Sequence, residues 1–329
     1  MHRPSSSALL ALLSAAAATC IALSAQTTSL RLVSTPWPPF TNEVEPRFAL
    51  DLVEAALDRF ATRATTTIVE PDKFTPSLLS NAFDGSAAAW KDPERQRALV
   101  FSQPYLENRL ILVGRHDEDV SAASLTDLKG KRIAIVDGYA YGEGLTASGA
   151  TLVRTRSEED GLTQLLANKA DYVLMDDLVV QYILNNYPNE AKTRLNVGSK
   201  PLLTRPLYFA VRRSYPNAAT IISRFNSQLR GMIADKTYHR LLHVTWIRAD
   251  VDGDGIPEYV PQSDQAGSVQ PVHAYSLFAE ASSAEAPKRF YYGGTVYTDW
   301  ASVPNRYKVD DPRYPDPRRS TASLFRFVW

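Results

Sequence analysis

The sequence contains very little cysteine and no excess of charge of either sign. Its 329 residues include one cysteine, Cys20, and 36 basic residues stand against 36 acidic ones. A single thiol excludes an intramolecular disulfide, so the stability of the fold must come from core packing. A balanced charge argues against a nucleic-acid binder or a polybasic protein of membrane surfaces, because both need a field of one sign. The sequence also has no Ser/His/Asp arrangement and no glycine-rich phosphate loop.

Long apolar runs are missing too, apart from one near the start of the chain. Residues 8–23 are apolar and follow Arg3, and small residues come next. This pattern is typical of a secretory signal peptide and is too short for a membrane span, which needs about 20 apolar residues. We therefore expect residues 1–25 to be a cleaved signal and the chain to be exported to the periplasm. A lipoprotein would instead be acylated at Cys20.

Strand and helix patterns alternate through most of the chain. Residues 30–35 have the alternation of a strand, and residues 48–61 place apolar side chains on one helical face. Residues 75–83 predict a short helix capped by Thr75, and residues 218–242 predict one long helix. This alternation favours an α/β fold with parallel-type sheets and helices on both faces.

Two such series of strands and helices are joined by extended strands near residues 110–115 and 204–211. Two series with two crossings predict two lobes and a hinge between them. After residue 245 the chain becomes rich in proline, aromatics and small polar residues, which predicts an irregular extension with a few short strands that lies on the main body. The expected division is residues 29–112 with 205–245 for lobe 1, 113–204 for lobe 2 and 246–329 for the extension.

Several motifs, in order, resemble the family 3 solute-binding proteins of ATP-binding-cassette importers. They are "PWPPF", "FALDLVEAAL", "DPERQRALVFSQPY", "SLTDLKGKRIAIVDG", "ANKADYVLMDD", "LYFAVRRSYPNAATIISRFNSQL" and "ADKTYHRLL". The resemblance implies a periplasmic-binding-protein type II fold whose lobes close over a small ligand by hinge bending. It also implies a monomer that hands an amino acid or related carboxylate to an inner-membrane permease.

The resemblance assigns a role to Arg95, which lies just ahead of an apolar strand. In the family, the arginine of this turn grips the carboxylate of the ligand, since a guanidinium donates two parallel hydrogen bonds and stays charged. The alternative is a surface salt bridge to Asp92 or Glu94. We expect Arg97 to lie on the solvated side of the turn. If Arg95 faces an open cleft, its removal should leave stability unchanged.

Other family positions are filled less regularly. Trp37 stands where an aromatic ring stacks on the ligand, although it could equally be wedged into the core. Asp176 stands where the second lobe offers a carboxylate to the ammonium of the ligand. The loop "DGYAY" matches a helix-start loop whose backbone N–H groups bind the carboxylate. In that loop Tyr139, Ala140 and Tyr141 replace the usual small hydroxyl residues.

The segment before the arginine departs most from the family. Small residues with donors and acceptors for the α-amino group are usual there, but Ala88 and Ala89 supply none and Trp90 is bulky. A pocket walled by Trp90, Trp37 and the loop tyrosines would be aromatic. This favours a flatter or less polar carboxylate, or a ligand with only one charged end recognised. A second stacking ring is missing unless Phe74 provides it.

The stretch "DVDGDGIPE" has the features of a calcium loop. Asp250, Asp252 and Asp254 alternate and Glu258 follows, so several carboxylate oxygens converge on one point. It resembles the calcium loops of thrombospondin-type repeats and differs from an EF-hand, because Pro261 holds the twelfth position. The alternative is a solvated acidic turn. We expect no required cofactor, with structural calcium as the one candidate ion.

Two other function classes stay open at this stage. The scaffold also resembles periplasmic dehydratases, which need a general acid or base in the cleft, and the candidates are Asp176, Glu143 and Lys91. The alternative is a ligand-sensing subunit that signals to a membrane partner through the extension. A binding protein without enzymatic activity is the first hypothesis.

Overall fold

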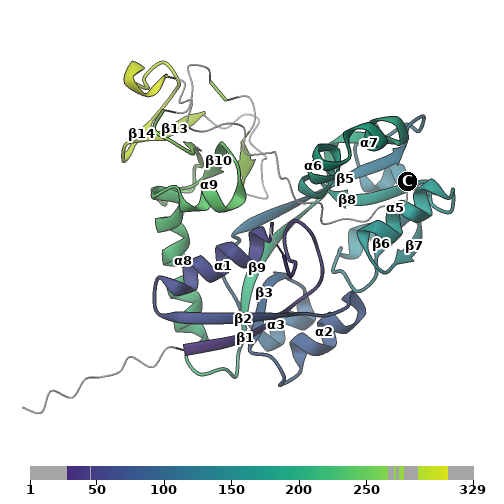
Figure 1. Cartoon of the computed structure of the whole chain (residues 1–329), viewed down its shortest axis with the longest axis horizontal. Coiled ribbons are helices and arrows are strands. Elements are labelled where there is room, and N and C mark those ends of the chain that lie inside the picture. Colours follow the sequence, from purple (N-terminus) through teal and green to yellow (C-terminus); the bar gives the residue numbers. More distant parts are fainter. Residues whose placement is uncertain (1–27, 45, 266–269, 272–273, 278–287, 310–329) are drawn as a thin grey trace, which may run out of the picture.

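The computed structural model describes residues 28–44, 46–265, 270–271, 274–277 and 288–309 (Figure 1). The predicted signal peptide, residues 1–25, lies outside the described residues. Within the described ranges, every helix is too short or too polar to cross a lipid bilayer.

One large mixed sheet forms the centre of the molecule. Its nine strands are β1 (Thr28–Ser34), β2 (Thr62–Ile68), β3 (Gly85–Trp90), β4 (Leu99–Phe101), β5 (Leu106–Arg115), β6 (Arg132–Val136), β7 (Thr151–Thr155), β8 (Tyr172–Asp176) and β9 (Leu195–Arg212). They lie in the order β2-β1-β3-β9-β5-β8-β6-β7, with β4 paired to β9. The pairs of β1 with β2 and β3, and of β6 with β7 and β8, are parallel.

Helices cover this sheet in two groups (Figure 1). They are α1 (Phe48–Asp58), α2 (Pro71–Leu79), α3 (Pro93–Ala98), the 3-10 turn η1 (Leu125–Leu128), α4 (Glu143–Thr146), α5 (Glu158–Leu166), α6 (Asp177–Asn186), α7 (Pro188–Arg194), α8 (Ala218–Ala234) and α9 (Thr237–Leu242). The apolar spacing explains the packing of α1, whose Leu50, Val53 and Leu57 are all buried.

Two long antiparallel strands, β5 and β9, connect the two groups. The group with β1 to β4, α1 to α3 and α8 forms lobe 1, and the group with β6 to β8 and α5 to α7 forms lobe 2 (Figure 1). The strand β9 bonds β3 and β4 of the first group and β5 bonds β8 of the second, so the pairing of β5 with β9 joins the two groups. This places a hinge where β5 and β9 run side by side.

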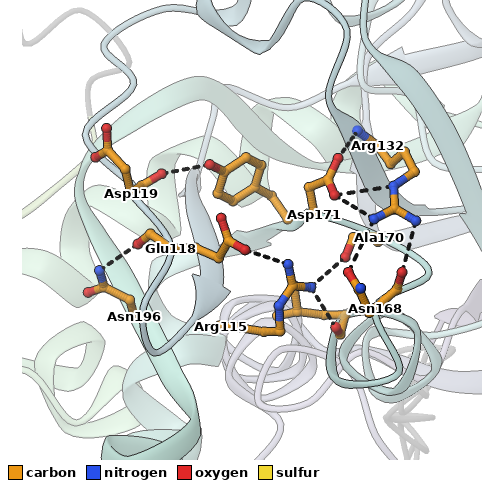
Figure 2. A network of polar contacts seen from close by, with 10 residues as sticks. Arg115, Glu118, Asp119, Arg132, Asn168, Ala170, Asp171 and Asn196 are labelled. Carbon is orange, nitrogen blue, oxygen red and sulfur yellow. Dashed lines mark hydrogen bonds and ion pairs between the residues drawn. The ribbon is translucent and has the colours of Figure 1, made fainter.

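A polar network holds lobe 2 together as a unit (Figure 2). Arg115 of β5 donates to the carbonyl oxygen of Ala170 at 2.9 Å and pairs with Glu118 at 2.6 Å. Arg132 of β6 pairs with Asp171 at 2.6 Å, just before β8. These contacts satisfy a carbonyl group after the end of α5 and join β5 and β6 to the turn that precedes β8. The network therefore joins the end of the connecting strand β5 to lobe 2.

Two helical predictions were wrong in their bounds. The helix expected from Thr75 begins at Pro71, because proline fits the first helical position, where no N–H is needed. Thr75 consequently lies inside α2 and does not cap it. The long helix expected over residues 218–242 is divided at Lys236, whose φ is 68°. The charged turn ahead of β4 is a short helix, α3, capped by Asp92.

The extension contains short strands, as expected, and they pair into one sheet. Its elements are β10 (Trp246–Ala249), β11 (Glu258–Pro261), β12 (Tyr275–Ser276), β13 (Arg289–Tyr292), β14 (Thr295–Tyr297) and the 3-10 turn η2 (Asn305–Tyr307). The strands form a second sheet in the order β12-β10-β11-β13-β14. Trp246, Tyr259, Phe290 and Tyr292 form its own aromatic core. Figure 1 shows this sheet beyond α9, on the side of lobe 1.

One tyrosine joins the extension to the hinge. The hydroxyl of Tyr275 accepts a hydrogen bond from the Glu107 N–H at 2.9 Å and donates one to the Glu107 carbonyl at 2.7 Å. Glu107 belongs to β5, and its neighbour across the ladder is Pro206, which has no N–H to donate. The side chain of Tyr275 therefore satisfies backbone groups at the point where the lobes join.

Candidate ligand-binding cleft

A small cavity lies between the lobes, next to the hinge. Its volume is about 30 Å³, enough for one or two water molecules. The structure brings five of the predicted site residues to this cavity: Trp37, Trp90, Arg95, Tyr139 and Ala140. The remaining lining residues are Thr35, Phe74, Ala88, Gly138 and Leu207.

Arg95 is held firmly at one wall of the cavity. Its Nη1 donates to the Trp90 carbonyl at 2.9 Å, its Nη2 donates to Thr75 Oγ1 at 2.7 Å, and its Nε lies 3.2 Å from a carboxylate oxygen of Asp92. The ring of Phe74 lies 5.2 Å from the guanidinium carbon. One N–H on each terminal nitrogen is not used by these bonds, because each carries two. Burial lowers the pKa of Arg95, but a guanidinium stays charged.

These contacts correct one expectation and agree with another. Arg95 does not face an open cleft, since it is 3 % exposed and bonded to lobe 1. The reason is that α3 turns its first residues back over the end of β3, which places the guanidinium against the main chain. The condition under which its removal would leave stability unchanged is therefore not met, and we now expect its removal to lower stability. Arg97 is exposed, as expected.

Aromatic rings from both lobes meet in the cleft. Trp37 and Trp90 of lobe 1 lie 5.5 Å apart between ring centroids, and Tyr139 of lobe 2 lies 5.4 Å and 5.5 Å from them. Tyr141 approaches Trp90 to 5.5 Å, and its hydroxyl accepts a bond from the N–H of Val136. Such edge-to-face pairs are favourable. The rings themselves therefore fill most of the space between the lobes.

A glycine permits the lobes to approach this closely. Gly138 has a φ of 77°, and a Cβ built on it would lie 2.7 Å from the Pro71 carbonyl oxygen. Pro71 begins α2 in lobe 1, whereas Gly138 belongs to the loop after β6 in lobe 2. Any larger residue at this position would press on the backbone of the opposite lobe as well as strain its own.

The carboxylate of Asp176 is hydrogen-bonded to other groups of the protein. It accepts hydrogen bonds from Asn108 Nδ2 at 3.0 Å, from the Arg109 N–H at 3.1 Å and from the Leu178 N–H at 2.8 Å, which caps α6. It is fully buried and does not line the cavity. Burial, and secondly Asp177, raise the pKa of Asp176. Its predicted contact with a ligand ammonium stays a prediction.

Two residues near the cleft were not predicted from the sequence to belong to the site. Asn108 of β5 accepts a bond from Trp90 Nε1 at 2.7 Å, so it orients that indole and links it to Asp176. Arg205 of β9 lies 5.7 Å from the ring of Trp90 and donates to the Lys91 carbonyl at 3.0 Å. Only the pairing of β5 with β9 places them beside the cleft, and this register is a long-range property.

The acid–base candidates do not form a catalytic group. Glu143 and Lys91 are exposed, whereas Asp176 is buried among its three N–H partners. A larger hollow of about 580 Å³ lies on lobe 1, at the end of α1 and the start of β2. It contains none of the cleft residues, so the smaller cavity is the candidate ligand site. The hollow is lined by Glu54, Asp58, Ala61, Arg63 and Ala64.

The calcium-like loop is paired with the side chain of an arginine from another strand. Oxygens of Asp250, Asp252 and Asp254 lie within 4.8 Å of one another, as expected. However, Arg289 of β13 pairs with Asp252 at 2.8 Å, with Asp254, and with Glu258 at 3.0 Å. This arginine was not predicted from the sequence, because it lies 31 positions after Glu258 and reaches the loop through the pairing of β11 with β13. Calcium binding stays a prediction, since an ion would have to displace the guanidinium.

Two α/β lobes joined by two strands, with a cavity between them, define the two-lobed class of binding proteins. The sequence model of the bacterial extracellular solute-binding proteins, family 3, matches residues 32–248. The chain therefore belongs to this family, and its fold is the periplasmic-binding-protein type II fold. The match ends at β10, so the rest of the extension lies beyond it.

Individual relatives agree with this assignment. The chain is 27 % identical over 223 residues to "ABC transporter arginine-binding protein 1" of Escherichia coli K12, covering 64 % of this chain and 86 % of that protein. An ancestral arginine-binding protein in complex with arginine has a TM-score of 0.55 at 23 % identity, with 65 % and 96 % covered. The glutamate complex of the GluR0 ligand-binding core from Nostoc punctiforme has a TM-score of 0.55 at 20 % identity, with 64 % and 96 % covered. The two structures are similar in fold.

Proposed function

We propose that this chain binds a small carboxylate-bearing ligand, an amino acid or a close relative of one, and delivers it to an ABC-type importer. The observation that carries the proposal is the position of Arg95 at the wall of the interlobe cavity. Its bonds to Trp90 and Thr75 hold the guanidinium in place and leave one N–H on each terminal nitrogen. Two such N–H groups can bind a carboxylate in parallel.

The lobes must open to admit the ligand and then close around it. A cavity of about 30 Å³ is too small for an amino acid, so the rings of Trp37, Trp90 and Tyr139 must separate when the ligand enters. We infer that the strands β5 and β9 bend and that ligand contacts replace ring–ring contacts. The relative named as an arginine-binding ABC transporter protein supports an amino-acid-like ligand and an inner-membrane permease. The signal predicted over residues 1–25 would direct the chain to the periplasm.

A thermal-shift screen of the mature protein tests this function. The panel should contain amino acids and aromatic carboxylates, each with its decarboxylated analogue. We expect carboxylates to raise the melting temperature and the matching amines to fail. If an amine stabilises the protein as much as its parent acid, the carboxylate site is wrong. Chemical change of a bound acid would instead favour the dehydratase-like alternative.

The contact between Tyr275 and Glu107 favours a second candidate, a ligand sensor. Because Tyr275 bonds the hinge strand β5, bending of the hinge would reach the sheet of the extension. Hydrogen exchange of β10 and β11 with and without ligand separates the two functions. A pure transport component should show no change there, whereas a sensor should show one.

A further inference from the structure

One edge of the hinge strand β5 is closed by a tyrosine of the extension. Strand β8 pairs with residues 110–114 of β5 and does not reach Glu107. The backbone groups of Glu107 face the same edge as the N–H of Arg109, which bonds the Asp176 carboxylate, because residues two apart in a strand point the same way. The hydroxyl of Tyr275 bonds both the N–H and the carbonyl of Glu107, at 2.9 Å and 2.7 Å, and both bonds are buried. Tyr275 therefore takes the place of a neighbouring strand at this position.

Three successive residues of β5 have partners in different parts of the molecule. The backbone of Glu107 is bonded to the extension, whereas the N–H of Arg109 bonds Asp176, the last residue of β8 in lobe 2. Asn108 lies between them and is fully buried. Its side chain accepts a hydrogen bond from Trp90 of lobe 1 at 2.7 Å and donates one to Asp176 at 3.0 Å. The backbone of β5 thus changes its partner from the extension to lobe 2 within two residues.

The extension is in turn fixed to lobe 1 through α9. His239 of α9 is fully buried, and its Nε2 donates to the carbonyl oxygen of Val260 in β11 at 2.9 Å. The neighbouring Tyr238 donates to the Tyr105 carbonyl at 2.6 Å, and the Tyr105 hydroxyl donates to the main chain of β3 at 2.8 Å. Glu107 is consequently held by a sheet that is itself bonded to lobe 1.

These attachments leave little of β5 free to bend. Glu107 is fixed on the side of lobe 1, and Leu110 is already paired with β8 in lobe 2. A change of backbone angles that separates the lobes must fall between these two points, at residues 108–109. Without the Tyr275 hydroxyl, the backbone groups of Glu107 would lose this partner, and the bend could extend toward the start of β5.

We propose that the extension is a hinge strap: Tyr275 holds β5 at Glu107, confines the bending of β5 to residues 108–109 and limits how far the lobes separate. The strap goes beyond the proposed function, because it requires the two-lobed fold and no particular ligand. Tyr275 also lies outside the family match, which ends at residue 248. Since the strap acts on the ligand-free protein, it lowers the population of widely open forms before any ligand binds.

The distance between the lobes in the ligand-free protein tests the strap. A chain without the predicted signal, residues 1–25, contains no cysteine, so spin labels can be placed on two introduced cysteines. Lys73→Cys in α2 and Thr163→Cys in α5 put one exposed label on each lobe. Electron–electron double resonance should give a narrow distribution of distances when Tyr275 is present. In Tyr275→Phe the distribution should be broader and shifted to longer distances.

Hydrogen exchange supplies a second measurement that needs no labels. Tyr275→Phe removes the bond to the Glu107 N–H, so this amide should exchange about threefold to tenfold faster than in wild type, the range for one hydrogen bond. The amides of β8 should keep their wild-type rates. An unprotected Glu107 amide in the wild type would by itself contradict the strap, whether or not the variant folds.

Tyr259→Phe is the matched control, because it removes a hydroxyl from the same sheet but within the aromatic core of the extension. It should give wild-type distances and wild-type exchange at Glu107. A folded Tyr275→Phe with the wild-type distribution, or equal broadening in both variants, would overturn the proposal. Since no ligand is present, this result is independent of the ligand screen, and either proposal can fail while the other stands.

Discussion

Replacing Arg95 by alanine should have a large effect on ligand binding. In the closed cleft the carboxylate of the ligand would lose its two parallel donors while it stays out of water. Removing one partner of a buried, hydrogen-bonded charge pair costs about 2–5 kcal/mol. We therefore expect a loss of affinity of roughly thirtyfold to several thousandfold. Arg95→Lys should recover only part of it, since an ammonium is a point charge.

The same substitution should also lower the stability of the ligand-free protein. It removes the bonds that Arg95 donates to the carbonyl of Trp90 and to Thr75, and it leaves that carbonyl buried without this donor. An unsatisfied buried polar group costs about 1–3 kcal/mol. Urea unfolding of Arg95→Ala should show this decrease. The binding measurement must therefore be made under conditions in which the variant is folded.

Calorimetric titration of the ligand from the screen separates the two effects. Arg97→Ala is the matched control, because Arg97 lies on the same short helix but is exposed. This control should keep both the affinity and the unfolding midpoint of the wild type. Equal affinities for wild type and a folded Arg95→Ala would refute the assignment of the carboxylate site.

Three further predictions concern other parts of the chain. Burial raises the pKa of Glu158 from 4.5 to about 8, so its contribution to stability is fully present below about pH 4.5 and is lost as the pH rises through about 8. Ligand-free Glu158→Gln should consequently be more stable than wild type by about 3 kcal/mol at pH 7 and as stable as wild type near about pH 4. Urea midpoints that are equal for the two proteins at both pH values would contradict this. Tyr275→Phe leaves two buried backbone groups of Glu107 without the hydroxyl, so it should lower the free energy of unfolding by about 1–3 kcal/mol, and an unchanged midpoint would show that these bonds are not needed. We expect residues 250–258 to take up one calcium ion in place of the Arg289 guanidinium, so that chelation lowers the melting temperature without abolishing ligand binding and Arg289→Ala increases the affinity for calcium. An unchanged melting profile, with no calcium found by elemental analysis, would leave Arg289 as the counter-charge.

Local patterns predicted most of the elements and the motifs of the family. The apolar face of α1, the cap Ser157 of α5 and the alternation of β1 depend on residues a few positions apart, which the sequence displays directly. The helix bounds that were wrong lie where proline chemistry or a left-handed residue such as Lys236 competes with periodicity. The cleft residues Trp37, Trp90 and Arg95 were found because their motifs are local as well.

Only the tertiary structure decided which partner each of these side chains has. The sequence determined by itself that the chain has two βα series, an arginine ahead of an apolar strand and an aromatic cleft. It could not show that Asp176 accepts hydrogen bonds from backbone and amide donors, that Glu158 is buried, or that Arg289 enters the acidic loop. The pairings of Asp176 and Arg289 join residues tens of positions apart through the register of β5 with β8 and of β11 with β13. A side chain's burial and its free donors and acceptors depend on such long-range packing, which no local pattern contains.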